Sequence, residues 1–330
     1  MKLVFFLAVI LFINFAMADD IFHTDYYKKV VKMYKKDIAK NPKDIERYYK
    51  LALAYRALED YDKAIKIYKK IENKKPTAKV YYNLALSYEK SFKYKESAEY
   101  ILKALKLDKD NEKYLILLKE LSKLLGIEYI RNKEYKEAID LFNLNLKYNL
   151  NDENSYFYLG YIYQKEKRYK KAIEAYKKVL KINNKDDYSH YNLGVIYLKT
   201  NKPKMAIKNL TKAIEINPYF GSAYLNLFEL SLINNISKNK ELEDKFLKYN
   251  SKNRRDIAIF EILKILNSIN IGKKVNLESW ADKYKGISLK GYNFDDIEKW
   301  IKKLKDKAKR DRLKKAVEFF KSNTEQKDIS

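Results

Sequence analysis

A motif of about 34 residues repeats along this chain, and no other feature of the sequence restricts the possible folds as strongly. The copy that begins near Glu153 carries Tyr156, Leu159 and Tyr163 in its first half. Residues at i, i+3 and i+7 share one face of an α-helix, and the second half repeats this spacing, so each copy predicts two amphipathic helices. One position of every copy holds a tiny residue: Ala52, Ala85, Gly126, Gly160 and Gly194. Because Gly costs a helix interior about 1 kcal/mol relative to Ala, its return there predicts a close approach of two helices.

The motif resembles the tetratricopeptide repeat, a helix–turn–helix unit of 34 residues. Five units begin near Ile45, Ala78, Lys119, Glu153 and Asp187. Since no such unit can bury its apolar face alone, the units stack on one another. The resemblance implies an all-α fold, a superhelical solenoid of about five full repeats plus an N-terminal half-repeat, followed by C-terminal helices. We expect the half-repeat helix over 19–44, the array over 45–232 and the C-terminal helical region over 233–330.

Two places depart from the repeat. Before the third unit, about seven extra residues, Glu112–Leu118, predict a longer first helix. A sixth unit begins at Gly221, but Phe228 stands at the tiny position and no matching second helix is recognisable in the sequence. The pattern therefore predicts that the array degrades after about Leu232.

The N-terminus has the parts of a secretory signal peptide over 1–18. Lys2 supplies a positive charge, Leu3–Ile13 is unbroken apolar sequence, and small residues stand at Ala16 and Ala18. We expect cleavage after Ala18 and export of the mature chain to the periplasm or another extracytoplasmic space. The alternative is an uncleaved membrane anchor, although the 16 residues of Leu3–Ala18 fall short of the roughly 20 that a spanning helix needs.

The C-terminal region predicts several helices, one around Phe260 and a shorter one around Trp280. Asn293 is predicted to be the N-cap of a basic amphipathic helix, which either kinks or becomes two helices at Lys309–Arg312. The candidate basic surface comprises Lys299, Lys302, Lys303, Arg310, Arg312, Lys314 and Lys315. Such a helix either caps the end of the solenoid or binds an anionic membrane or polymer surface, for which the apolar edge Val317–Phe320 is available.

The amino-acid composition argues against most kinds of catalytic, metal-binding and phosphate-binding site. The chain has no Cys, only two His and seven Gly, which excludes thiolate sites and leaves little material for a His cluster or a phosphate-binding loop. His190 stands at an aromatic position of its unit and is predicted to pack rather than to bind a ligand. We expect no catalytic residues, no cofactor and no metal. The net charge of +26 comes mainly from Lys spread along the chain, and with so few Arg and predicted export, nucleic acid is not an expected partner.

The resemblance implies a concave groove, lined by the first helices of the units, that binds a segment of another protein. The residues at groove-facing positions are Tyr49, Leu53, Tyr82, Leu86, Phe157, Tyr161, Tyr191 and Val195. Some family members bind acidic chaperone tails through a carboxylate clamp, but Tyr49 and Leu53 stand where its first Lys and Asn would be. We therefore predict a non-enzymatic protein–protein interaction scaffold of the bacterial cell envelope with envelope proteins as partners. The alternative is a peripheral binder of anionic surfaces that works through the basic C-terminal helix.

Overall fold

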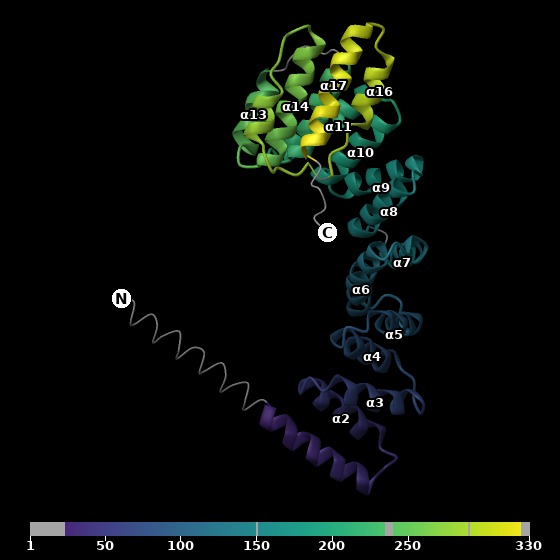
Figure 1. Cartoon of the computed structure of the whole chain (residues 1–330). Coiled ribbons are helices and arrows are strands. Elements are labelled where there is room, and N and C mark those ends of the chain that lie inside the picture. Colours follow the sequence, from purple (N-terminus) through teal and green to yellow (C-terminus); the bar gives the residue numbers. More distant parts are fainter. Residues whose placement is uncertain (1–23, 150, 235–239, 290, 325–330) are drawn as a thin grey trace, which may run out of the picture. The chain divides into compact units, whose positions relative to one another are not determined.

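The structure is a computed structural model, and it describes residues 24–149, 151–234, 240–289 and 291–324 (Figure 1). All regular secondary structure in these ranges is α-helical. The chain divides into two compact units, with the division after Ile162. Each unit is an array of helix pairs, so the protein is an all-α solenoid of tetratricopeptide-repeat type, as the sequence predicts.

The first unit contains the helix formed by residues 24–40, followed by α2 (Ile45–Ala57), α3 (Tyr61–Glu72), α4 (Ala78–Lys90), α5 (Tyr94–Leu107), α6 (Glu112–Arg131), α7 (Tyr135–Tyr148) and most of α8 (Glu153–Lys165). The helix of residues 24–40 packs Val31 into the same core as α2 and α3, as a half-repeat would. The seven extra residues lengthen α6, which is one continuous helix of 20 residues. The first helix of the third unit therefore begins at Glu112, seven residues before the repeat motif, as the sequence predicts.

The second unit contains the end of α8, then α9 (Tyr169–Ile182), α10 (Asp187–Lys199), α11 (Pro203–Ile216), α12 (Gly221–Ile233), α13 (Lys240–Asn250), α14 (Arg254–Asn270), α15 (Glu278–Lys283), α16 (Asp295–Lys303) and α17 (Lys307–Thr324). α17 packs on α14 and α16, and α16 also contacts α12.

The tiny position brings paired helices into direct contact. An ideal Cβ at Gly126 would lie 2.2 Å from Cζ of Phe142, and one at Gly194 would lie 2.7 Å from Cγ of Leu210. Ala52 is fully buried in the equivalent place of an earlier unit. The close approach that the sequence predicts is therefore confirmed.

A left-handed residue follows the first helix in each of the five pairs from α2–α3 to α10–α11. These residues share φ values between 55° and 63° and are Glu59, Phe92, Lys133, Lys167 and Asn201. The N–H of the next residue returns to a carbonyl in the last turn of the helix, as when Lys93 donates to the carbonyl of Tyr88 at 2.9 Å. This bond satisfies a carbonyl that would otherwise lack a partner at the helix end.

A second helix does follow α12, contrary to the sequence prediction. α13 ends at Asn250, 34 residues after the end of α11 at Ile216, so the helical spacing of the repeat continues. This pair departs from the repeat motif in its residue types, since Phe228 stands at the position that holds Ala or Gly in the five earlier units. Its ring lies 5.6 Å from that of Phe246 in α13 and 4.7 Å from that of Phe260 in α14. The rings of Phe228, Phe246 and Phe260 thus join α12, α13 and α14, and α14 packs directly on α12.

The basic C-terminal helix is two helices, as one of the two sequence interpretations had it. The break lies at Leu304–Asp306, upstream of the predicted Lys309–Arg312, because Leu304 is extended and the Asp306 carboxylate accepts from the N–H of Lys309 at 2.9 Å. The prediction that Asn293 caps the first of them is wrong. The N-cap residue of α16 is Phe294, and it makes no side-chain cap hydrogen bond.

Candidate functional site

An open cleft of about 560 Å³ lies in the first unit, between the first helices of its repeats. Its residues come from α2, α4 and the beginning of α6: Tyr49, Lys79, Tyr82, Asn83, Asn111, Glu112, Lys113 and Tyr114. Of the predicted groove residues, Tyr49 and Tyr82 lie in this cleft.

Asn83 holds the floor of the cleft together. Its side-chain amide, 6% exposed, donates to the Tyr49 hydroxyl at 2.8 Å and to the Lys79 carbonyl at 2.7 Å. Arg56 donates to the side-chain oxygen Oδ1 of Asn83. Because its polar atoms are engaged in this way, Asn83 acts as a positioning residue for Tyr49.

Aromatic rings and ammonium groups line the walls of the cleft. The rings of Tyr82 and Tyr114 lie 4.8 Å apart, and the Lys79 ammonium lies 4.7 Å from the centre of the Tyr49 ring. Burial raises the pKa of both Tyr82 and Tyr114, so their hydroxyls remain neutral hydrogen-bonding groups. Exposed Lys79 and Lys113 flank the opening. Such a lining can hold an apolar side chain and donate hydrogen bonds to peptide carbonyls or carboxylates.

A half-buried carboxyl group lies in the second unit at a place that the sequence analysis missed. Glu229 lies 34 residues after Val195 and thus occupies the groove-facing position of α12. Partial burial and, to a smaller extent, the charge of nearby Asp296 together raise the pKa of Glu229 to about 7, although a hydrogen bond from Tyr292 and the charge of Lys199 oppose the shift. The Tyr292 hydroxyl donates to Oε2 of Glu229 at 3.2 Å. The sequence did offer one indication of this site, because Glu229 is the one charged residue of α12.

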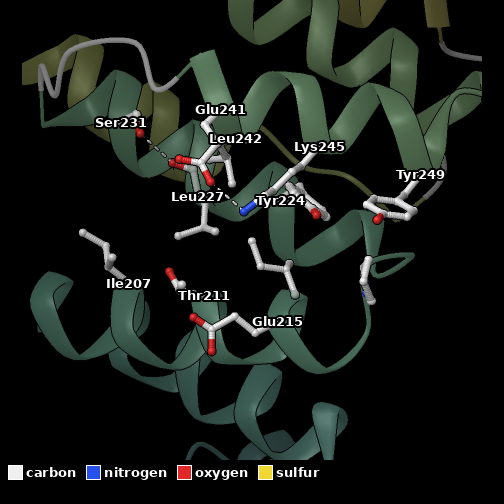
Figure 2. Close-up of a pocket in the computed structure, with 12 residues that line it drawn as sticks. Ile207, Thr211, Glu215, Tyr224, Leu227, Ser231, Glu241, Leu242, Lys245 and Tyr249 are labelled. Atoms are coloured by element: carbon white, nitrogen blue, oxygen red, sulfur yellow. Dashed lines mark hydrogen bonds and ion pairs between the residues drawn. The ribbon is translucent and has the colours of Figure 1, made fainter.

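A larger cavity of about 620 Å³ opens between α11, α12 and α13 (Figure 2). Tyr224 and Leu227 of α12 form part of its lining, and Glu241 and Lys245 of α13 form an ion pair of 2.7 Å at its edge.

Comparison with protein families decides the class of the chain. Models described as tetratricopeptide repeat match residues 48–78 and 78–111. A model described as anaphase-promoting complex, cyclosome, subunit 3 matches residues 131–213. The chain is a tetratricopeptide-repeat protein. Repeats of this family are in general non-enzymatic scaffolds for protein–protein interaction. A comparison with curated proteins gave no match.

Several solved structures are similar to this repeat protein. YrrB, described as "a TPR protein with an unusual peptide-binding site", is 24% identical, with 58% of this chain and 95% of YrrB covered and a TM-score of 0.41. A MamA protein is 25% identical, with 52% of this chain and 91% of MamA covered and a TM-score of 0.39. MamA from Desulfovibrio magneticus RS-1 is 20% identical, with 52% and 94% covered and a TM-score of 0.36.

The other predicted groove residues of the repeat array differ in exposure. In the first unit, Leu53 is 38% exposed, whereas Leu86, Phe157 and Tyr161 are half-buried and do not line the cleft. In the second unit, Val195 and Tyr191 are half-buried. The Tyr191 ring lies 4.6 Å from that of Phe220, and its hydroxyl accepts from Asn226 at 3.5 Å. Burial raises the pKa of Tyr191, with Arg255 and Asp256 of α14 close by. Tyr191 is therefore partly covered by Phe220 and Asn226.

The predicted basic surface is partly engaged within the protein. Lys299 pairs with Asp296 at 2.8 Å and Lys314 with Glu318 at 3.8 Å. Arg310 and Arg312 donate to backbone carbonyls, those of Leu304 and Lys273. Among the described residues, Lys302, Lys303 and Lys315 are exposed and form no ion pair.

The apolar edge that was available for a membrane surface is not exposed. Val317 is 2% and Phe320 0% exposed, and the Phe320 ring lies 5.0 Å from that of Trp280. α17 therefore uses its apolar side within the fold, as a capping helix does. No helix in the described part of the chain is long and apolar enough to cross a membrane. No group of three or more metal-ligating side chains was found among those same residues.

Proposed function

We propose that this repeat protein is a non-enzymatic adaptor that binds a segment of a partner protein in the cleft of its first unit. The observation that carries the proposal is the open, tyrosine-lined cleft between α2, α4 and α6, whose floor is fixed by the hydrogen bonds of Asn83. Aromatic side chains on a rigid floor provide large contact area at little cost in conformational entropy.

The lining also indicates the chemistry of the partner segment. Half-buried Tyr82 offers part of its ring to an apolar side chain, and its neutral hydroxyl suits the carbonyls of an extended main chain, while Tyr114, which is 7% exposed, supports the Tyr82 ring from below. The charged residues that line the cleft are two lysines, Lys79 and Lys113, and one carboxylate, Glu112, so the lining has a net positive charge. We therefore propose an extended segment with one apolar anchor and a net negative or neutral charge.

A substitution in the cleft tests the proposal directly. We expect Tyr82→Ala to weaken partner binding by about tenfold, because buried aromatic anchors contribute on the order of 1–2 kcal/mol or more. Partners are captured by crosslinking in cells and measured by pull-down of the full-length chain. The matched control is Tyr219→Ala, which removes a ring that is 69% exposed and lies in the second unit.

Two outcomes would contradict the adaptor proposal. One is equal partner recovery with Tyr82→Ala and with wild type. The other is loss of all partners at ~0.5 M salt, because screening removes binding through surface charges but not binding in an aromatic cleft. The second outcome would instead favour the anionic-surface alternative through Lys302, Lys303 and Lys315.

We further propose that the adaptor works in a bacterial cell envelope after export. The support is the sequence of 1–18, with its charged start, short apolar run and small residues before Asp19. This stretch lies outside the described residues. The mass of the N-terminal peptide of the protein isolated from cells tests the proposal. A chain that begins at Asp19 supports export with cleavage, and a cytoplasmic chain that retains Met1 contradicts it.

A further inference from the structure

A small cavity of about 210 Å³ opens in the second unit, between α16 and the faces of α10 and α12. Its volume is that of about seven water molecules at ~30 Å³ each, so it suits a small molecule rather than a segment of another protein. The apolar part of its wall includes Leu198, Leu230 and Ile233. A wall that combines apolar side chains with a few polar groups is typical of small-molecule sites, because the polar groups fix the orientation of the ligand.

The charged side chains at this cavity leave one carboxylate and one ammonium group unpaired. Lys299 and Asp296 pair with each other at 2.8 Å. Glu229 forms no ion pair with the described residues, since the charge of Lys199 acts on it from beyond ion-pair distance. Lys303 is exposed and likewise has no acidic partner in this part of the chain. The cavity therefore presents two opposite charges, those of Glu229 and Lys303, that are not joined to each other.

The wall also holds polar atoms with free hydrogen-bonding capacity. Glu229 accepts from the Tyr292 hydroxyl through Oε2 at 3.2 Å, and none of the described residues donates to its other oxygen. Trp300 lines the cavity and is 8% exposed, and its indole N–H makes no hydrogen bond within the described ranges. The indole of Trp280, in contrast, donates to the carbonyl of Ala258 at 3.2 Å. Since a buried Trp usually finds an acceptor, the Trp300 N–H is available to an oxygen atom of a ligand.

We propose that this cavity binds a free α-amino acid with an apolar side chain. The ammonium group of the ligand pairs with Glu229, and its carboxylate accepts from Lys303 and from the indole N–H of Trp300. The side chain of the ligand contacts the apolar part of the wall. Both charges of the ligand are needed, because the cavity offers one unpaired charge of each sign. This site lies in the second unit and is independent of the cleft proposed to bind a partner segment.

Indole N–H signals in ¹⁵N–¹H NMR spectra of the full-length protein test the proposal. The chain has two Trp, and Trp280→Phe assigns their signals. The spectra are recorded at about pH 8, where Glu229, whose pKa is about 7, is largely ionised. We expect L-leucine to shift the Trp300 signal with a Kd below about 1 mM and to leave the Trp280 signal in place, because that N–H already has an acceptor. A Trp300 signal that stays unchanged up to about 10 mM leucine would overturn the proposal.

Two analogues of leucine separate the contributions of its charges. N-acetyl-L-leucine lacks the ammonium group, and L-leucinamide lacks the carboxylate. Each should bind at least about tenfold more weakly than leucine, because each loses a charge-assisted hydrogen bond. Leucinamide that binds as tightly as leucine would overturn the proposal, since the site would then fit the N-terminal residue of a polypeptide. Equally tight binding of N-acetyl-L-leucine would overturn it as well, because the site would then accept a simple anion.

Substitutions at the two unpaired charges complete the test. Glu229→Gln and Lys303→Gln should each weaken leucine binding at least about tenfold. The matched controls are Glu318→Gln and Lys315→Gln, which remove exposed charges of α17 and should bind leucine as wild type does. Urea unfolding of all four variants checks that each is folded. Wild-type affinity in Glu229→Gln or in Lys303→Gln would contradict the proposed site, whereas partner recovery through the cleft of the first unit should be the same in all four variants.

Discussion

Gly126→Ala tests the packing rule on which the array depends. An ideal Cβ at Gly126 would lie 2.2, 2.7 and 3.0 Å from three ring atoms of Phe142. The ring cannot easily move away, because Phe142 is 0% exposed and stacks on Tyr158 with a centroid distance of 5.4 Å. The added methyl group must therefore push α6 and α7 apart.

Gly126→Ala changes the free energy of unfolding through two effects of opposite sign. Removing Gly from a helix interior stabilises the folded chain by about 1 kcal/mol. Overpacking a filled core costs about 1–3 kcal/mol, and the upper end applies because 2.2 Å falls more than an ångström short of the 3.4 Å at which ordinary contact begins. We expect Gly126→Ala to lower the free energy of unfolding by about 2 kcal/mol.

The assay is urea unfolding followed by far-UV circular dichroism, with a double-mutant cycle. In the Phe142→Leu background the smaller side chain leaves room for the methyl group, so the loss caused by Gly126→Ala should shrink by at least about 1 kcal/mol. Gly194→Ala is the second comparison. Its Cβ would lie 2.7 Å from Cγ of Leu210, a shallower overlap than the 2.2 Å at Gly126, so we expect a net loss of about 1 kcal/mol or less. A Gly126→Ala variant as stable as wild type, or losses that simply add with Phe142→Leu, would refute the reasoning.

Three further predictions use the same unfolding assay. Phe92 is 79% exposed with φ at 58°, so Phe92→Gly should raise the free energy of unfolding by about 1 kcal/mol, and a decrease would show that its ring is needed for packing. Asn145, 0% exposed, donates to Asp152 and Ser155 at 3.0 and 2.9 Å, so Asn145→Ala should cost about 2 kcal/mol, and a cost below about 0.5 kcal/mol would contradict this role. The pKa of Glu229 is raised by burial to about 7, so its contribution to stability is fully present below about pH 4.5 and is lost as pH rises toward about 7. Glu229→Gln should thus match wild type at about pH 4 and exceed it by up to about 3 kcal/mol at about pH 8, and parallel stability curves would disprove the titration.

Much of the repeat array could be predicted because its stabilising contacts are local in sequence. Each helix pair is set by apolar periodicity and by a tiny residue, and the beginnings of α2, α4, α8 and α10 coincide with the predicted starts of their units. Two of the residues that line the cleft, Tyr49 and Tyr82, could be predicted for the same reason, since they occupy the same position in successive repeats. The role of Asn83 could not, because its partners Tyr49 and Arg56 come from another repeat.

By itself, the sequence determined the fold class, the pairing of helices and the approximate extent of the repeats, since a 34-residue period encodes contacts between neighbouring helices. It did not reveal α13, because Phe228 replaced the expected packing by a cluster with Phe246 and Phe260, whose geometry depends on where α14 lies. Tertiary structure alone placed Tyr292 on Glu229, 63 residues apart. No local pattern specifies such a contact, because it forms only when the C-terminal helices fold back on the array, and that return depends on the packing of α17 against α14.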